Sequence, residues 1–285
     1  MTENGTAAPA TPEISLRMLT KDTRLCMSLA ARPSNIGTRF HNYLYQALNL
    51  DYVYKAFTTT DLAAAIGGVR ALGIRGCAVS MPYKEDCIPM VDEVDPSASV
   101  IGSVNTIVND DGVLKAYNTD YLAIASLIAE YRLDPALPFG VLGSGGMAKA
   151  VVAALRDAGF TDGTVVARNE ATGRAIADQY GYGWAPTVEG NPALLVNATP
   201  VGMAGHPAAE DLPVPPAVVD GAQVVFDVVA FPALTPLVLR AQANGQTVIT
   251  GAEVIALQAL EQFVLYTGVR PEAELVAAAS AYSRI

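Results

Sequence analysis

A glycine-rich turn between a short apolar run and a helical pattern constrains the fold more than any other feature of this sequence. The segment 141–148, VLGSGGMA, follows the apolar run and opens a helix predicted over residues 146–158. Gly143 permits a tight turn, Gly145 leaves room for close approach of a ligand, and Ala148 allows close packing of helix on strand. Because the first N–H groups of a helix attract anions, the pattern predicts a dinucleotide-binding βαβ unit. The alternative is a glycine turn without a ligand.

The end of the next predicted strand bears on the choice of dinucleotide. An Asp or Glu there would accept hydrogen bonds from a ribose 2′-hydroxyl and repel a 2′-phosphate. This chain has Ala167, Arg168 and Asn169 instead. Since an arginine can clamp a phosphate through its planar fork, NADP is favoured over NAD. The alternative is an exposed Arg168 that caps the following helix, and Glu170 nearby weakens the phosphate interpretation.

Two series of alternating strands and helices predict two α/β domains. The first series has strands near 26–30, 52–57 and 76–81 with helices over 38–48 and 61–72. The second has strands near 139–143, 164–168, 194–198, 224–229 and 246–250 with helices over 146–158, 170–180 and 234–243. The fold class is therefore α/β with two domains: a Rossmann NADP-binding domain, and a discontinuous, mostly parallel α/β substrate domain.

The domain limits follow from the same pattern. Residues 1–118 are expected to form the substrate-binding domain, completed by two helices within 252–285, and residues 119–251 the Rossmann domain. The second of these helices is predicted over 271–282, opened by its proline. A helix over 119–132 is a candidate bridge, Asp110, Asp111 and Gly112 predict a local hairpin, and residues 1–13 read as a loose tail.

Charge and cysteine usage exclude several classes of protein. The chain of 285 residues has 18 basic and 28 acidic side chains, a net charge of −10, which disfavours nucleic-acid and membrane partners. Cys26, Cys77 and Cys87 lie in apolar runs without a CxxC spacing, so buried reduced thiols and a cytoplasmic location are expected. With only two histidines, His41 and His206, and no carboxylate cluster at ligand spacing, no metal is predicted.

A lysine and an aspartate are the candidate catalytic groups. Lys84 follows a predicted strand in the segment Ser80-Met81-Pro82-Tyr83-Lys84, which places it at the carboxyl edge of the sheet. Asp120 lies in Asn118-Thr119-Asp120 at the start of a helix, where the macrodipole favours negative charge. The alternatives are a solvated surface lysine and an ordinary helix cap.

Taken together, these motifs resemble the shikimate dehydrogenase family, most closely its shikimate dehydrogenase-like subgroup. The similarity extends from about residue 22 to the end. It is carried by Gly76 to Lys84, Val104 to Thr106, Asn118 to Asp120, Gly143 to Ala148, Asn197 to Met203, Thr235-Pro236, Gly251, and Gln258-Ala259 ahead of Phe263.

The resemblance implies an NADP-dependent oxidoreductase that interconverts a cyclic hydroxy acid and its ketone, with shikimate and 3-dehydroshikimate as the reference pair, and thereby a place in the shikimate pathway of aromatic amino acid biosynthesis. It implies Lys84 and Asp120 as the catalytic pair. The substrate-binding candidates are Asn35, Thr38, Ser80, Asn105 and Gln258. The cofactor-binding candidates are Gly143, Ser144, Gly145, Gly146, Met147, Ala148, Arg168, Asn197, Thr199, Met203 and Gly251.

The sequence departs from the family pattern where a substrate carboxylate would bind. The serine pair that family members place before the residue matched by His41 is Asn35 and Gly37 here. The usual asparagine is Ala78 and the usual tyrosine Ala230. Because each lost hydrogen bond to a charged group is worth roughly 1.5 to 3 kcal/mol, turnover of shikimate could fall by about a hundredfold. His41 itself is interpreted as a structural histidine rather than a substrate contact.

These departures leave alternatives to the reference reaction. One is a dehydrogenase of quinate or another polyol acid, and another, from a different class, is an NADPH-binding regulator with residual catalysis. The expected partner is a small cyclic hydroxy acid, and the chain is expected to be a monomer or homodimer.

Overall fold

The computed structural model describes residues 18–285 as two compact units, and the predicted tail over residues 1–13 lies outside the described part. The first unit comprises the described residues up to Glu93 together with Thr106–Lys115 and Gln262–Ile285. The second unit comprises Val94–Asn105 and Ala116–Glu261. The chain therefore passes between the units at more places than the predicted division at 118 and 251 assumed.

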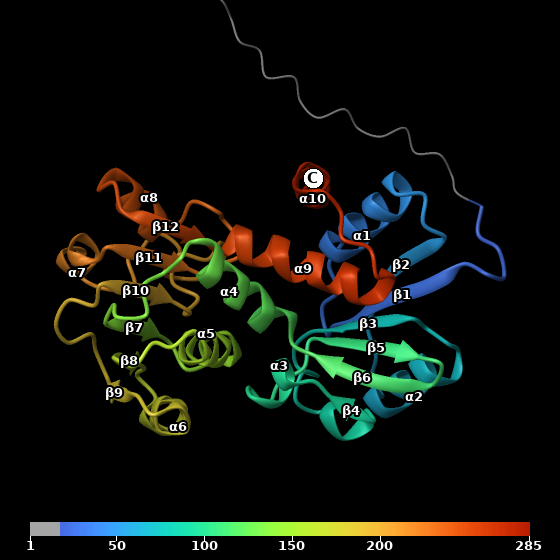
Figure 1. Cartoon of the computed structure of the whole chain (residues 1–285), viewed down its shortest axis with the longest axis horizontal. Helices are drawn as coiled ribbons and strands as arrows, with labels where there is room; N and C mark the ends of the chain where they lie inside the picture. The colour runs from blue at the N-terminus through green and yellow to red at the C-terminus, as the bar shows by residue number, and fades with distance from the viewer. Residues whose placement is uncertain (1–17) are drawn as a thin grey trace, which may run out of the picture. The chain divides into compact units, whose positions relative to one another are not determined.

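The first unit is built on a six-stranded sheet with the order β2-β1-β3-β5-β6-β4 (Figure 1). Strand β1 pairs in parallel with β2 and β3, and β3 pairs antiparallel with β5, so the sheet is mixed. The strand bounds are Arg24–Leu29 (β1), Tyr52–Phe57 (β2), Gly76–Val79 (β3), Glu93–Val94 (β4), Thr106–Asp110 (β5) and Val113–Tyr117 (β6). The first three strands are joined by the crossover helices α1 (Ile36–Ala47) and α2 (Leu62–Ala71), and α10 (Ala273–Ser283) packs on α1.

The antiparallel hairpin predicted within this sheet is confirmed. Between β5 and β6, Asp111 and Gly112 have φ angles of 51° and 93°, the left-handed conformations that a two-residue hairpin turn requires. The Asn109 side chain accepts a hydrogen bond of 2.8 Å from the Gly112 N–H and so closes the turn.

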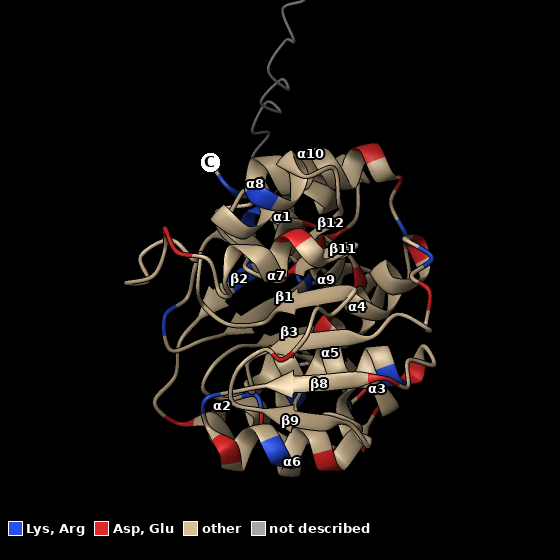
Figure 2. Ribbon diagram, turned by 90° about the vertical axis from the view of Figure 1, so that its left-hand side faces the viewer, with Lys and Arg blue, Asp and Glu red and all other residues tan. Residues whose placement is uncertain are grey.

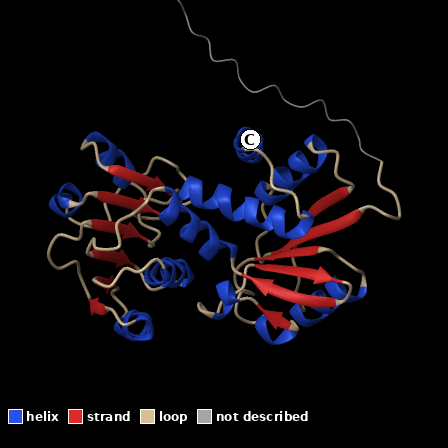
Figure 3. Cartoon of the chain, viewed as in Figure 1, coloured by secondary structure: helices blue, strands red, loops and turns tan. Residues whose placement is uncertain are grey.

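The second unit is a doubly wound parallel sheet with the order β12-β11-β10-β7-β8-β9. Its strands are β7 (Phe139–Leu142), β8 (Gly163–Val166), β9 (Gly183–Ala185), β10 (Leu194–Asn197), β11 (Val224–Asp227) and β12 (Thr247–Thr250). Helices α5 (Gly146–Asp157), α6 (Glu170–Tyr180), α7 (Pro216–Gly221) and α8 (Pro236–Ala243) connect them (Figure 3). Since the strand order reverses between β7 and β10, the carboxyl ends of these two strands form the switch point at which such sheets bind ligands. The predicted two-domain α/β fold with a Rossmann part is confirmed.

Apolar side chains cover both faces of this second sheet. Val141 and Val165 belong to a buried cluster that includes residues of α4 (Thr119–Glu130), α5 and α6. Leu142 and Val166, the next residues along the same strands, belong to the cluster on the opposite face with residues of α7 and α8. This alternation explains why the strands are continuous apolar runs in the sequence.

Several short elements were missed by the sequence pattern. They are the 3₁₀ turn η1 (Ile88–Met90), α3 (Pro96–Ser99), β4, β9 and α7. The helix predicted over 271–282 begins at Ala273 with Glu272 as its N-cap, so Pro271 precedes the helix instead of opening it. The preceding helix, α9 (Gly251–Thr267), contributes residues to both units.

The three cysteines are buried and unpaired, which confirms the predicted thiols. Within residues 18–285, no helix combines the length and apolarity needed to cross a bilayer. The same residues contain no group of three or more His, Cys, Asp and Glu side chains that could hold a metal ion.

Candidate functional site

The glycine turn after β7 has the geometry that the sequence predicted for it. Gly143 adopts φ +112°, and a Cβ atom there would lie 2.9 Å from the Ala198 carbonyl oxygen, so no other residue fits without strain. A Cβ on Gly145 or Gly146, by contrast, would meet no atom within 4 Å. The first glycine is thus required by the protein itself, whereas the next two leave open space at the surface. That space is where a ligand's phosphates could reach the backbone.

Helix α5 starts directly from this turn. Its N-cap is Gly145, which has no side chain to satisfy the first N–H groups of the helix. Met147 is half-buried, and Ala148 is fully buried in the core beneath the turn. The Ser144 and Thr172 hydroxyls lie 2.7 Å apart, joining the turn to the first residues of α6. An anion at this helix end would be stabilised by free N–H donors and by the macrodipole.

Arg168 lies at the carboxyl end of β8 with its side chain exposed. The cap of α6 is Asn169, which accepts from the Thr172 N–H at 3.2 Å, so Arg168 does not have the capping role considered as its alternative. Glu170 pairs with Arg174 at 2.7 Å, and acidic and basic segments alternate along α6 (Figure 2). Arg168 has no ion-pair partner in the described part of the chain, which leaves its guanidinium available for a phosphate.

The segment after β10 carries the other predicted cofactor residues. Met203 is exposed over 38% of its surface, and Thr199 is half-buried. Asn197, in contrast, is completely buried, and both ends of its side-chain amide are used within the protein. This burial argues against a direct cofactor contact by Asn197. It favours a role in supporting, from inside the protein, the residues that follow β10. Gly251 opens α9, where a Cβ would lie 2.1 Å from the Val229 carbonyl oxygen, so its backbone must stay bare.

Asp120 lies at the start of α4, where a local hydrogen-bond network holds the neighbouring residues. Asn118 is the N-cap, since its side chain accepts from the Tyr121 N–H at 3.0 Å, so Asp120 is not an ordinary cap. Asn105 accepts from the Thr119 N–H at 2.8 Å and from the Thr119 hydroxyl at 3.1 Å. Two motifs distant in sequence are thereby brought together. Asp120 sits in the first turn, only 7% exposed, where the helix dipole favours its charge.

Lys84 lies in a turn that follows β3 and is half-buried. The Ser80 N–H donates to the Leu29 carbonyl at 2.9 Å, which ties the end of β3 to the end of β1. The Tyr83 hydroxyl donates to the Thr59 carbonyl at 2.8 Å, which ties the same turn to the segment after β2. These two hydrogen bonds hold the turn that carries Lys84 at the carboxyl edge of the first sheet.

The other substrate candidates of the first unit lie at the start of α1. Asn35 is the exposed N-cap of this helix, and its side chain makes no capping hydrogen bond. The Thr38 hydroxyl is buried and has no hydrogen-bond partner among residues 18–285. A Cβ on Gly37 would lie 3.5 Å from the Tyr54 hydroxyl, an ordinary contact distance. Ser80 is exposed on the neighbouring turn, and Gln258 is half-buried on α9 in the second unit.

His41 is part of a buried aromatic cluster behind these residues. Its ring stacks on Tyr54 with centroids 4.4 Å apart, and Tyr45, Phe263 and Tyr266 lie within about 6 Å. Burial lowers the pKa of His41 from 6.5 to about 3, opposed only in part by the Gln262 amide. A neutral imidazole without exposed surface supports the structural interpretation of this histidine.

Each unit therefore gathers part of the predicted site. Lys84, Ser80, Asn35 and Thr38 belong to the first unit, while Asp120, Asn105, Gln258 and all cofactor candidates belong to the second. That Lys84 and Asp120 act as a pair stays a prediction. Asp227 is not among the site residues predicted from the sequence, although it is completely buried and its carboxylate accepts hydrogen bonds from Asn197, Val229 and Thr235.

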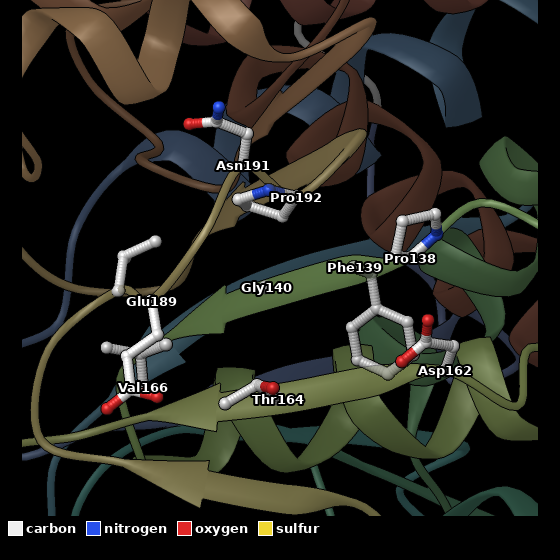
Figure 4. A pocket seen from close by; sticks show the side chains of 10 residues that line it. Pro138, Phe139, Gly140, Asp162, Thr164, Val166, Glu189, Asn191 and Pro192 are labelled. Atoms are coloured by element: carbon white, nitrogen blue, oxygen red, sulfur yellow. The ribbon is translucent and has the colours of Figure 1, made fainter.

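A cavity of about 190 Å³ lies elsewhere on the second unit, beside β7 and β8 (Figure 4). It is lined by Pro138, Phe139, Gly140, Asp162, Thr164, Val166, Val188, Glu189, Asn191 and Pro192. None of these is a predicted site residue, and the two carboxylates would repel a phosphate. The cavity is therefore distinct from the glycine turn.

Comparison with known proteins agrees with this geometry. The chain is 57% identical over 268 residues to the shikimate dehydrogenase-like protein of Haemophilus influenzae, an alignment that covers 94% of this chain and 99% of that protein. The chain belongs to the shikimate dehydrogenase family. Residues 35–107 also match the family model described as the shikimate dehydrogenase substrate binding domain.

Two solved structures of similar proteins extend the comparison. The shikimate 5-dehydrogenase of Thermus thermophilus, in complex with NADP(H) and shikimate, is 29% identical with a TM-score of 0.81, covering 93% of this chain and 100% of that one. The quinate dehydrogenase of Corynebacterium glutamicum, in complex with NAD, is 26% identical with a TM-score of 0.81, covering 91% and 98%. The similarity thus spans both units.

Proposed function

We propose that this chain is an NADP-dependent oxidoreductase that interconverts a cyclic hydroxy acid and its ketone, with shikimate and 3-dehydroshikimate as the reference pair. The observation that carries the proposal is the glycine turn at the switch point of the second sheet, with an exposed arginine at the end of the next strand. A helix end with free N–H donors suits a pyrophosphate, and Arg168 suits the 2′-phosphate that distinguishes NADP from NAD.

NADPH, when bound, supplies the hydride that reduces the ketone carbon. Lys84 then has two tasks at the ketone oxygen: its ammonium stabilises the negative charge that develops there, and it donates the proton that completes the hydroxyl group. Asp120 is assigned to orient this ammonium toward the ketone oxygen. In the reverse direction the same lysine accepts the proton from the hydroxyl group. Asn105 and Gln258 are assigned to substrate hydroxyl groups, and Met203 and Thr199 to the cofactor.

The carboxylate end of the substrate site rests on different groups from those of the family pattern. Thr38 supports a replacement role, because its buried hydroxyl has no hydrogen-bond partner in the described part of the chain and can donate to a carboxylate. Asn35 adds an exposed amide at the N-terminus of α1, where the helix dipole also favours an anion. Ser80 adds a third donor on the neighbouring turn.

The other two functions considered from the sequence are less well supported. A curated relative from Chlorobaculum tepidum, 37% identical over 83% of this chain and 87% of its own length, is named an NADP-dependent shikimate dehydrogenase. A pure regulator has no need of a lysine fixed at the sheet edge or of a carboxylate in the first turn of α4. We place the enzyme in the cytoplasm as a monomer or homodimer, a location that the three unpaired thiols support.

The test is a substrate panel with the purified full chain. NADPH oxidation is followed with 3-dehydroshikimate and 3-dehydroquinate, and NADP reduction with shikimate, quinate and other hydroxy acids, each repeated with NAD. Turnover of the shikimate pair with a preference for NADP is expected. Absence of turnover with every member of the panel would contradict the proposal, and faster turnover of quinate would reassign the substrate.

A further inference from the structure

Two buried polar side chains face each other at the ends of neighbouring strands in the second unit. Asn197 ends β10 and Asp227 ends β11, and the two are partners in the parallel register of these strands. Both side chains are completely buried, and the Asn197 amide donates to an Asp227 oxygen at 3.0 Å. Buried polar groups of this kind persist only when their hydrogen bonds are satisfied.

Asp227 is satisfied from three directions without a counter-charge. One carboxylate oxygen accepts from the Asn197 amide and from the Val229 N–H at 3.1 Å. The other accepts from the Thr235 hydroxyl at 2.5 Å, and Thr235 is itself the N-cap of α8, accepting from the Val238 N–H at 3.2 Å. Burial raises the pKa of Asp227, and these three donors oppose that effect. In the described part of the chain this carboxylate forms no ion pair.

The same network determines the path of the segment after β10. The Asn197 carbonyl oxygen of the side chain accepts from the Thr199 N–H at 3.1 Å and from the Thr199 hydroxyl at 2.6 Å. Its amide group also donates to the Val201 carbonyl at 3.1 Å. Asn197 therefore holds residues 198–201 from behind, through three hydrogen bonds that no apolar side chain could make.

Two glycines among the cofactor candidates, and Gly202 next to Met203, lie directly against parts of this network. A Cβ on Gly143 would lie 2.9 Å from the Ala198 carbonyl oxygen, and a Cβ on Gly202 would lie 3.1 Å from the Thr235 side chain. A Cβ on Gly251 would lie 2.1 Å from the Val229 carbonyl oxygen. Asn197, Asp227 and Thr235 therefore hold the backbone and side chains against which three segments pack. These segments are the glycine turn, the residues after β10 and the start of α9.

We infer that Asn197, Asp227 and Thr235 are positioning residues, which hold segment 198–203 against the glycine turn and thereby set the affinity of the second unit for NADPH. None of the three reaches the surface, so each acts through Thr199, Met203 and the turn at Gly143. The inference rests on the proposed function, because it concerns the site that binds the cofactor. It predicts that the network affects cofactor affinity beyond its effect on stability.

The test measures NADPH affinity by isothermal titration calorimetry in the full chain. Asp227→Asn keeps an oxygen that accepts from Asn197 but presents an NH₂ donor, in place of an acceptor, to the Thr235 hydroxyl. We expect this variant to raise the Kd for NADPH about tenfold or more. Thr235→Val removes the hydroxyl at nearly constant volume and is expected to raise the Kd several-fold, whereas Thr235→Ser, which keeps the hydroxyl, stays within about twofold of the parent. The KM for NADPH should rise in parallel, with little change in the KM for the hydroxy acid.

A matched control separates positioning from stability. Tyr182→Phe removes a half-buried hydrogen bond of 2.7 Å to the Phe160 carbonyl in the same unit, away from segment 198–203. It should lower Tm and leave the Kd for NADPH unchanged. If Asp227→Asn and Thr235→Val lower Tm as this control does but keep the parent Kd, the inference is wrong while the proposed function stands. If the unaltered chain itself binds no NADPH, the proposed function fails first.

Discussion

In each unit, candidate site residues lie at the carboxyl edge of the sheet, but different features of the chain form this edge in the two units. In the second unit the site is defined by backbone: Gly143, Gly202 and Gly251 each face an atom that a side chain would strike. In the first unit it is defined by side chains on exposed turns, among them Asn35 and Ser80. Steric requirements of a backbone leave little freedom, whereas polar side chains at a rim can be exchanged without disturbing the fold. Under the proposed function, the cofactor turn of the second unit is sterically constrained, whereas the substrate candidates on the exposed turns of the first unit can be exchanged.

The largest expected effect separates catalysis in the first unit from cofactor binding in the second. Lys84→Ala should lower kcat by about 10² to 10⁴, because the proton donor to the developing alkoxide is lost. The Kd for NADPH should stay unchanged. The matched control is Lys55→Ala, which removes an exposed lysine that lies 3.9 Å above the Phe57 ring on the edge strand β2. Equal losses of kcat in both variants would contradict the catalytic role of Lys84. A parallel loss of NADPH binding in Lys84→Ala would contradict the separation of catalysis in the first unit from cofactor binding in the second.

Two buried groups, one in each unit, should contribute to acid stability with opposite signs. The pKa of His41 is lowered from 6.5 to about 3 in the folded first unit, so between these values the unfolded chain binds a proton that the folded chain does not. The free energy of unfolding therefore falls as the pH falls through this window, by up to about 1.4 kcal/mol per pH unit. The pKa of Asp227 is raised in the second unit, so its own contribution to stability grows as the pH falls.

Denaturant unfolding across this pH window measures the contribution of His41. His41→Phe, which keeps an aromatic ring in the cluster, should flatten the acid-dependent loss of stability. The control is His206→Asn, which replaces the other histidine of the chain, on a surface segment, and should leave the slope in place. A slope that is the same in His41→Phe as in the parent would show that the buried imidazole is not its source.

A smaller effect concerns cofactor choice. Arg168→Gln should raise the KM for NADP roughly ten- to a hundredfold, since a hydrogen-bonded ion pair with the 2′-phosphate is lost, and should leave the KM for NAD unchanged. Arg174→Gln is the control, because Glu170 holds the Arg174 guanidinium, which also lies 4.4 Å from the Trp184 ring centroid. A similar rise in both KM values for Arg168→Gln would place this arginine outside the 2′-phosphate site.

The smallest expected effect tests how adjustable the substrate edge is. Asn35→Ser combined with Gly37→Ser introduces the serine pair of the family pattern, and a Cβ on Gly37 fits at 3.5 Å from the Tyr54 hydroxyl. The kcat/KM for shikimate should rise by about tenfold as donors to its carboxylate return. The single Gly37→Ser variant serves as the intermediate step. Unchanged kcat/KM in the double variant would mean that Thr38 and Ser80 already supply this binding, or that the substrate lacks a carboxylate there.

Much of the second unit could be predicted from sequence, because its features are local. The turn at Gly143, the strand and helix around it and Arg168 at the end of the next strand all follow from spacing within about 30 residues. The hairpin at Gly112 followed in the same way. The role of Asp227 could not be seen, because its partners Asn197 and Thr235 meet it only when β10, β11 and α8 come together.

The sequence by itself determined the α/β class, the glycine turn and the family, since periodicity and motif spacing are properties of the chain. Only the tertiary structure decided which polar residues are exposed and which are buried. It placed Asn197 in a buried hydrogen-bond network behind segment 198–201 and His41 in an aromatic cluster that keeps it neutral. The physical reason is that burial and hydrogen-bond partners depend on residues far apart in the chain, and these two properties fix the chemistry of a polar side chain.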